Sequence, residues 1–195
     1  MRLFIALDIE EQIRLRIARF IVGLEGFAPD ARWVTPESLH VTLKFIGELP
    51  APTVDSVNAA LSEVESKAAE IHFRGYGFFP TAKSARVFWL GLETGPELAA
   101  MAASIDQRTA ALGIPTEERA FSPHLTLARA RGGSGRPYRQ RSDKPNRVFE
   151  RLQEKLAALP IPEFGTMTAR EFFLYQSQLS PKGSKYTKLA RFDLH

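Results

Sequence analysis

Short runs of alternating apolar and polar residues are separated along the chain by segments in which apolar residues recur every three or four positions. The first run, residues 2–8, alternates well enough for a β-strand. One helical face follows, formed by four apolar residues: Ile13, Ile17, Phe20 and Leu24. Asp8 and Glu11 have the spacing of a capping box, and Gly26 ends the pattern. This segment therefore predicts a strand followed by a helix.

The same two patterns continue along the rest of the chain. Further strands are predicted at 31–34, 39–46, 71–79, 86–92, 121–129, 166–177 and 185–194. Further helices are predicted at 52–69, 96–112 and 148–159. Paired strands between single helices favour an α+β fold with antiparallel sheets. Gly-x-Gly-x-x-Gly and the Walker lysine motif are absent, and no break in composition divides the chain, so we expect residues 1–195 to form one domain.

The composition fits a packed protein without thiol chemistry. The chain has 195 residues, of which 44% are hydrophobic, enough for an apolar interior. It has no cysteine, which excludes disulfides, cysteine-ligated zinc and a thiol nucleophile. The apolar run at residues 2–7 is too short for a signal peptide, and no stretch is long enough to span a bilayer. We therefore expect a cytoplasmic protein that does not enter the membrane.

Positive charge is concentrated in one segment. The net charge is only +4, but between Arg129 and Arg147 seven basic residues accompany a single acid, Asp143. A local field of this sign attracts polyanions such as nucleic acid. Glycines and prolines between residues 131 and 146 predict a loop, whose charges would equally suit a solvated, solubilising segment. The sequence leaves both interpretations open.

The most informative feature is a tetrapeptide that occurs twice. His40-Val41-Thr42-Leu43 is followed 84 residues later by His124-Leu125-Thr126-Leu127, so two of the four histidines have the same local frame. Residues two apart in a strand point to the same face. Each histidine is therefore expected beside its threonine, with the apolar residues of the motif on the opposite face. If the two strands lie side by side about a pseudo-twofold axis, two imidazoles and two hydroxyls converge.

This set of groups suits phosphodiester chemistry without a metal. Histidine titrates near neutral pH, so one ring can deprotonate water while the other protonates the leaving oxygen. The hydroxyls of Thr42 and Thr126 can donate hydrogen bonds to the phosphoryl oxygens. No metal or cofactor is expected, because two histidines are too few for a stable zinc site and the nearby carboxylates lack ligand spacing. A structural role is the alternative for each motif, as it is for His72, which has no threonine two residues on.

At these residues the sequence resembles the two-histidine phosphoesterase superfamily, and within it the bacterial RNA 2',3'-cyclic phosphodiesterases, also called 2'-5' RNA ligases. The resemblance covers nearly the whole chain and is carried by residues 2–7, 33–34, 40–47, 86–91 and 121–129. It implies a bilobal α+β fold of two intertwined, pseudo-symmetric lobes, each with an antiparallel sheet flanked by helices. It also implies an active-site groove between the lobes.

The resemblance further implies an activity and the residues that perform it. The activity is hydrolysis of ribose 2',3'-cyclic phosphates, on RNA ends or nucleotides, to 2'-phosphomonoesters. His40 would be the general acid (proton donor) and His124 the general base (proton acceptor). Thr42 and Thr126 would hold the phosphate, and Arg129 would contact it. We expect the chain to act as a monomer.

Arg129 and Phe45 occupy equivalent positions, each five residues after its histidine. An odd offset turns a side chain to the other face of an ideal strand, so Arg129 can reach the site only at a strand end or a bulge. Phe45 could stack on a base of bound RNA or belong to the core, and the sequence favours neither. The basic loop from Arg131 to Arg147 could contact the RNA backbone.

Other functions use the same residues. The site could join RNA ends by the reverse reaction, forming a 2'-5' bond. The chain could instead be a non-catalytic nucleotide-binding module, although the presence of both histidines and both threonines argues against this. An esterase for a different cyclic phosphate would differ only in its substrate pocket. We rank hydrolysis first because water is present at high concentration.

Overall fold

The computed structural model describes residues 1–131 and 145–195, whose strands form two antiparallel sheets. The first sheet contains β1 (Arg2–Leu7), β3 (Val41–Glu48), β8 (Glu171–Ser180) and β9 (Gly183–Asp193) in the order β3-β1-β8-β9. The second contains β2 (Ala31–Trp33), β4 (Ala69–Phe79), β5 (Val87–Thr94), β6 (His124–Ala130) and β7 (Glu163–Ala169) in the order β2-β6-β5-β4-β7. The predicted α+β fold with antiparallel sheets is confirmed.

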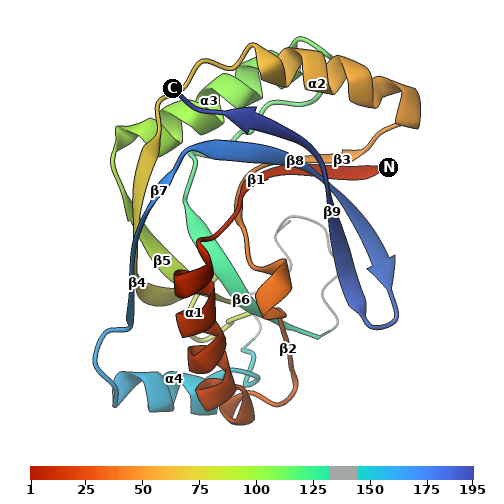
Figure 1. The fold of residues 1–195 in the computed structure, drawn as a ribbon. Coiled ribbons are helices and arrows are strands. Elements are labelled where there is room, and N and C mark those ends of the chain that lie inside the picture. The colour runs from red at the N-terminus through yellow and green to blue at the C-terminus, as the bar shows by residue number, and fades with distance from the viewer. Residues whose placement is uncertain (132–144) are drawn as a thin grey trace.

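The helices flank the two sheets, as Figure 1 shows. The α-helices are α1 (Glu11–Leu24), α2 (Val54–Ser62), α3 (Pro96–Ala110) and α4 (Glu150–Ala157). The short 3-10 helices are η1 (Glu25–Phe27), η2 (Pro36–Ser38) and η3 (Ala51–Thr53). α3 packs against β3 of the first sheet, whereas α1 packs against β7 of the second. None of the described helices is long and apolar enough to cross a membrane.

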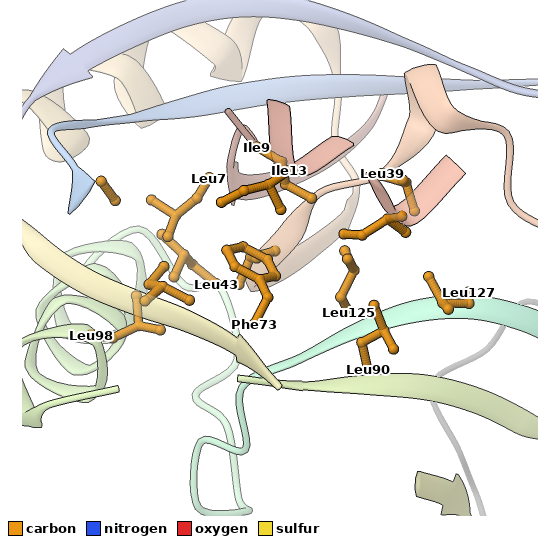
Figure 2. Packing of buried hydrophobic residues seen from close by; sticks show 14 of the residues in the cluster. Leu7, Ile9, Ile13, Leu39, Leu43, Phe73, Leu90, Leu98, Leu125 and Leu127 are labelled. Carbon is orange, nitrogen blue, oxygen red and sulfur yellow. The ribbon is translucent and has the colours of Figure 1, made fainter. Parts of the chain in front are cut away.

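One large cluster of buried apolar side chains connects the two sheets. Figure 2 shows Leu7, Leu43, Phe73, Leu90 and Leu125 meeting in this cluster, although they come from both sheets. Alternate residues of β1 point from the first sheet into this cluster: Leu3, Ile5 and Leu7. The other face of β1 contributes to a small separate cluster: Phe4, Ala6, Phe173 and Tyr175. The first sheet is therefore buried on two faces, of which only one belongs to the main core.

The chain crosses between the sheets at places that local patterns did not reveal. The predicted strands at 31–34 and 39–46 do not pair with each other, since β2 pairs with β6 and β3 pairs with β1. The turn containing η2 carries the chain from one sheet to the other. The single strand predicted at 166–177 is also wrong, because β7 and β8 lie in different sheets and Arg170 separates them.

Two predictions about helices are wrong as well. α2 is shorter than predicted, because Ala69 already belongs to β4. Asp8 does not cap α1, whose N-cap is Glu10 without a side-chain hydrogen bond. The Asp8 carboxylate instead lies 2.5 Å from Arg14 and 2.7 Å from Lys188, so it joins the start of α1 to β9 rather than satisfying helix N–H groups.

Candidate active site

His40 lies between η2 and β3, on the face of the first sheet opposite the main core. Its ring centroid is 4.8 Å from that of Phe4 and 5.1 Å from that of Tyr186. Nδ1 lies 2.7 Å from the carbonyl oxygen of Ser38. A carbonyl oxygen can only accept a hydrogen bond, so Nδ1 carries the hydrogen and Nε2 of the neutral ring has the free lone pair.

His124 repeats this arrangement at the start of β6 in the second sheet. Its Nδ1 lies 2.9 Å from the carbonyl oxygen of Ser122, which selects the same tautomer. The ring packs edge-to-face against Phe79 at a centroid distance of 5.2 Å and lies 6.3 Å from Trp89. Each sheet therefore presents one imidazole whose Nδ1 is held by a carbonyl oxygen, which leaves the lone pair of the neutral ring on Nε2.

The threonines share a face with their histidines. Thr42 and Thr126 are partly exposed. The apolar residues beside them are buried in the main core: Val41, Leu43, Leu125 and Leu127. The structure therefore contains the alternation predicted for both motifs.

A β-bulge follows Thr42. The register of β3 against β1 shifts between Thr42 and Lys44, which leaves Leu43 as an extra residue. The extra residue reverses the alternation beyond it, so Leu43 and Lys44 are both buried whereas Phe45 is 49% exposed. The interpretation of Phe45 as a core residue is thus wrong. Its ring centroid lies 6.2 Å from that of Phe4, on the side of the sheet where His40 lies.

A bulge at the same position follows Thr126. The register of β6 against β5 shifts between Thr126 and Ala128, with Leu127 as the extra residue. Leu127 and Ala128 are both buried, and Arg129 is exposed. The bulge cancels the odd offset, so Arg129 faces the same side of the sheet as His124.

Arg129 acts electrostatically on both histidines. Burial lowers the pKa of His40 to about 4; the Ser38 carbonyl opposes this change and the Arg129 cation adds to it. Burial, followed by the Arg129 cation, also lowers the pKa of His124, again against its carbonyl partner. The Arg129 cation thus contributes to the electrostatics of both rings, although they come from different sheets. At pH 7 both rings of the free protein are neutral.

Arg129 itself has the features of an anion site. Partial desolvation by the surrounding protein lowers the pKa of this exposed side chain, and Tyr186 of the first sheet opposes this change. Within residues 1–131 and 145–195, no carboxylate forms an ion pair with this guanidinium. A cation without an acidic partner, placed near two imidazoles, suits a phosphate group.

Arg14 anchors the turn that carries His40. Its Nη1 donates hydrogen bonds to the carbonyl oxygens of Pro36 at 2.5 Å and Leu39 at 3.3 Å, and the side chain is only 13% exposed. The turn that supplies the Ser38 carbonyl is thereby fixed to α1. Sequence reasoning missed this role of Arg14, because its partners in the turn lie more than twenty residues away and no local pattern links them.

Sequence reasoning also missed the two carbonyl groups that orient the imidazoles. The signal was present, since Ser38 and Ser122 each stand two residues before a histidine, so the repeat is Ser-x-His-x-Thr-Leu. The main-chain oxygen makes the contact in both places, and any residue provides one. The contact therefore depends on the path of the main chain and not on the serine side chain.

The strands beside the two threonines carry side chains of contrasting size at corresponding positions. Beside the first threonine, Ala6 of β1 pairs with Phe173 of β8. Beside the second, Trp89 of β5 pairs with Gly77 of β4. A Cβ added at Gly77 would lie 2.1 Å from the indole ring of Trp89. In the first sheet the residue beside the threonine is small and its outer neighbour is large. In the second sheet the residue beside the threonine is large and its outer neighbour is small.

The remaining candidates lie apart from this site. His72 of β4 lies 2.5 Å from Glu163 and 3.6 Å from Glu93, so it joins neighbouring strands as a structural histidine does. In the part of the chain that the structure describes, no group of three or more His, Cys, Asp or Glu side chains could hold a metal ion. Most of the predicted basic loop, residues 132–144, lies outside the described residues.

Two antiparallel sheets that each present a His-x-Thr strand define a two-histidine phosphoesterase. The chain belongs to the LigT-like phosphoesterase family, whose sequence model matches residues 7–89 and 90–186. The two matched segments each contain one of the motifs.

Named relatives extend over the whole chain. A protein of Archaeoglobus fulgidus named RNA 2',3'-cyclic phosphodiesterase is 34% identical over 193 residues, covering 99% of this chain and 100% of that protein. A protein of the same name from Methanothermobacter thermautotrophicus is 30% identical over 195 residues, covering 99% and 98%. The crystal structure of E. coli LigT complexed with 3'-AMP is similar, with a TM-score of 0.76, 26% identity, and coverage of 99% of this chain and 97% of that one.

Proposed function

We propose that this chain hydrolyses the 2',3'-cyclic phosphate at the end of an RNA or on a nucleotide, leaving a 2'-phosphomonoester. One observation carries the proposal: each sheet presents an imidazole whose Nδ1 is held by a carbonyl oxygen, and both rings have a pKa lowered by burial and by Arg129, which forms no ion pair with a carboxylate among the described residues. The names of the archaeal relatives support this activity. The binding of 3'-AMP by E. coli LigT supports a nucleotide substrate.

The reaction is an in-line displacement at phosphorus. Nε2 of His124 accepts a proton from water while the water oxygen bonds to phosphorus. The bond from phosphorus to O3' breaks, and Nε2 of His40 gives its proton to O3', so the phosphate stays on O2'. The assignment of His40 as acid and His124 as base follows the family pattern. Thr42 and Thr126 donate hydrogen bonds to the phosphoryl oxygens, and Arg129 offsets their charge.

His40 acquires its proton together with the substrate. In the free protein burial keeps the pKa of His40 at about 4, so the ring is neutral near pH 7. An anionic phosphate beside the ring favours the protonated form and raises that pKa. The negative charge of the substrate thus prepares the acid that the reaction needs.

We further propose that Phe45 stacks on a base of the bound substrate. Its ring is half exposed and lies on the same side of the sheet as His40. Stacking of this kind tolerates any base sequence. Residues 1–195 would act as one domain and as a monomer.

A chelator-containing assay tests the proposal. The substrate is a short RNA ending in a 2',3'-cyclic phosphate, in excess EDTA, and the position of the product phosphate is determined. We expect a 2'-phosphate, and a loss of at least about a hundredfold in kcat for His40→Ala and for His124→Ala. His72→Ala is the matched control and keeps full activity.

Three outcomes contradict the proposal. Activity that disappears on chelation would indicate a metal-dependent reaction. Equal binding of nucleotide by the wild type and both histidine variants, with no product from any of them, would indicate a binding module. Formation of a 2'-5' bond from cyclic-ended RNA and a 5'-hydroxyl strand, without hydrolysis, would indicate a ligase.

A further inference from the structure

A pocket of about 710 Å³ adjoins His40, and none of its described lining residues belongs to the second sheet. Its walls come from the start of α1, the turn containing η2, and β9. His40 itself lines the pocket, which therefore borders the candidate active site. The volume lies within the range of pockets that hold a nucleotide-sized ligand.

The proposed reaction fixes the side on which the ribose lies. In an in-line displacement the attacking water and the leaving oxygen occupy opposite sides of phosphorus. Water is held by His124 and the leaving O3' by His40, so the ribose that carries O3' lies on the His40 side. The RNA strand continues from this ribose through its 5' oxygen. A strand that continues on this side passes along the first sheet, where the pocket lies.

The walls of the pocket can accept a phosphodiester. The Asp8 carboxylate, which would repel a phosphate, is neutralised by Arg14 at 2.5 Å and by Lys188 at 2.7 Å. Lys185 lines the pocket, is exposed, and forms no ion pair within the described part of the chain. It is therefore a cation free to contact a phosphate.

The same walls can accept a base. Leu15 lines the pocket and is 50% exposed, so it offers apolar contact area. Tyr186 adds a partly exposed aromatic ring that also contacts the His40 ring edge-to-face. Glu37, the one lining carboxylate without an ion pair among the described residues, can accept a hydrogen bond from the amino group of adenine, cytosine or guanine. Aromatic and cationic groups together are typical of single-stranded RNA sites.

We infer that this pocket binds the nucleotide that precedes the cyclic end of an RNA strand, with Lys185 on the connecting phosphate. The inference rests on the proposed function and on His40 as the acid. It makes the protein selective for RNA ends over free cyclic nucleotides.

The test compares two substrates that differ by one nucleotide. One is adenosine 2',3'-cyclic phosphate, and the other is the dinucleotide ApA ending in a 2',3'-cyclic phosphate. We expect the wild type to have the higher kcat/KM on the dinucleotide. Lys185→Glu is expected to lower that value by about three- to tenfold, and to leave the mononucleotide within about twofold. Its dinucleotide KM is also expected to depend less on salt concentration, because one screened charge contact is lost.

Two further variants complete the test. Thr187→Trp fills the pocket from β9 and is expected to lower activity on the dinucleotide alone, so turnover of the mononucleotide shows that the variant is folded. Lys182→Glu makes the same charge change in the turn of the same hairpin, outside the pocket, and is the matched control that affects neither substrate.

The inference is overturned if Lys185→Glu and Thr187→Trp change both substrates equally, or change neither. Turnover of both substrates by the wild type without any preference also overturns it, while the proposed function survives. Absence of turnover on either substrate removes the proposed function and the inference together.

Discussion

Replacing His40 by phenylalanine is expected to make the folded protein less sensitive to acid. The ring of His40 is packed among aromatic side chains, at 4.8 Å from Phe4 and 5.1 Å from Tyr186 between centroids, so a phenyl ring suits the site. The substitution removes the hydrogen bond to Ser38 and therefore lowers stability at neutral pH. It also removes a titrating group whose pKa differs between the folded and unfolded chains.

The magnitude follows from that difference in pKa. Burial, against the opposing Ser38 carbonyl and with smaller contributions from nearby charges, lowers the pKa of His40 to about 4 in the folded protein. In the unfolded chain the pKa is about 6.5. Below pH 6.5 the unfolded chain therefore binds a proton that the folded protein excludes, and stability falls with pH until about pH 4. At about 1.4 kcal/mol per pKa unit the full loss is about 3 kcal/mol, of which about 2 kcal/mol has occurred at pH 5.

The measurement is urea unfolding of the wild type and His40→Phe at pH 7.5 and pH 5. The wild type is expected to lose about 2 kcal/mol more than the variant between these pH values. Both proteins retain every other titrating group, including His124, so the difference between them isolates His40. Equal losses in the two proteins would refute the reasoning, because they would show that His40 titrates near its ordinary pKa in the folded state.

Three other substitutions test separate parts of the structure. Arg129→Gln removes a cation that lowers the pKa of both active-site imidazoles, so the pH optimum of kcat/KM is expected to rise while the rate falls; an unchanged optimum would contradict this. Lys44→Met leaves Asp106 without its buried ammonium partner and is expected to cost about 3 kcal/mol in urea unfolding, which Asp106→Leu in the same chain largely restores. Gly77→Ala places a methyl group against the Trp89 indole and is expected to cost about 1–3 kcal/mol, with a smaller loss in the Trp89→Phe background.

The local geometry of the candidate site could be predicted from the sequence, because it depends on neighbouring residues. Alternation placed each threonine beside its histidine, and the structure has this arrangement. The condition set for Arg129, a strand end or a bulge, is met by a bulge. The position of Phe45 stayed open, since neither the bulge in β3 nor its effect on exposure has a local sequence signal.

The remaining features depend on contacts between distant segments. The sequence between β2 and β3 suggests a simple turn between paired strands. In the structure it joins two sheets, because β2 pairs with β6 and β3 pairs with β1. Arg14 looks like one of several arginines on α1, and its role in fixing the His40 turn exists only once that turn is packed against the helix. Asp8 looks like a helix cap because the lysine that binds it, Lys188, is 180 residues away.

The contrasting pairs beside the two threonines show that the matching halves of the site are supported by different neighbours. Ala6 with Phe173 and Trp89 with Gly77 occupy corresponding places, so neither half can adopt the other's residue at one position alone. A lone change at either member leaves a void or a collision. The two halves of the site share the residues that the proposed chemistry needs, namely one histidine and one threonine in each sheet.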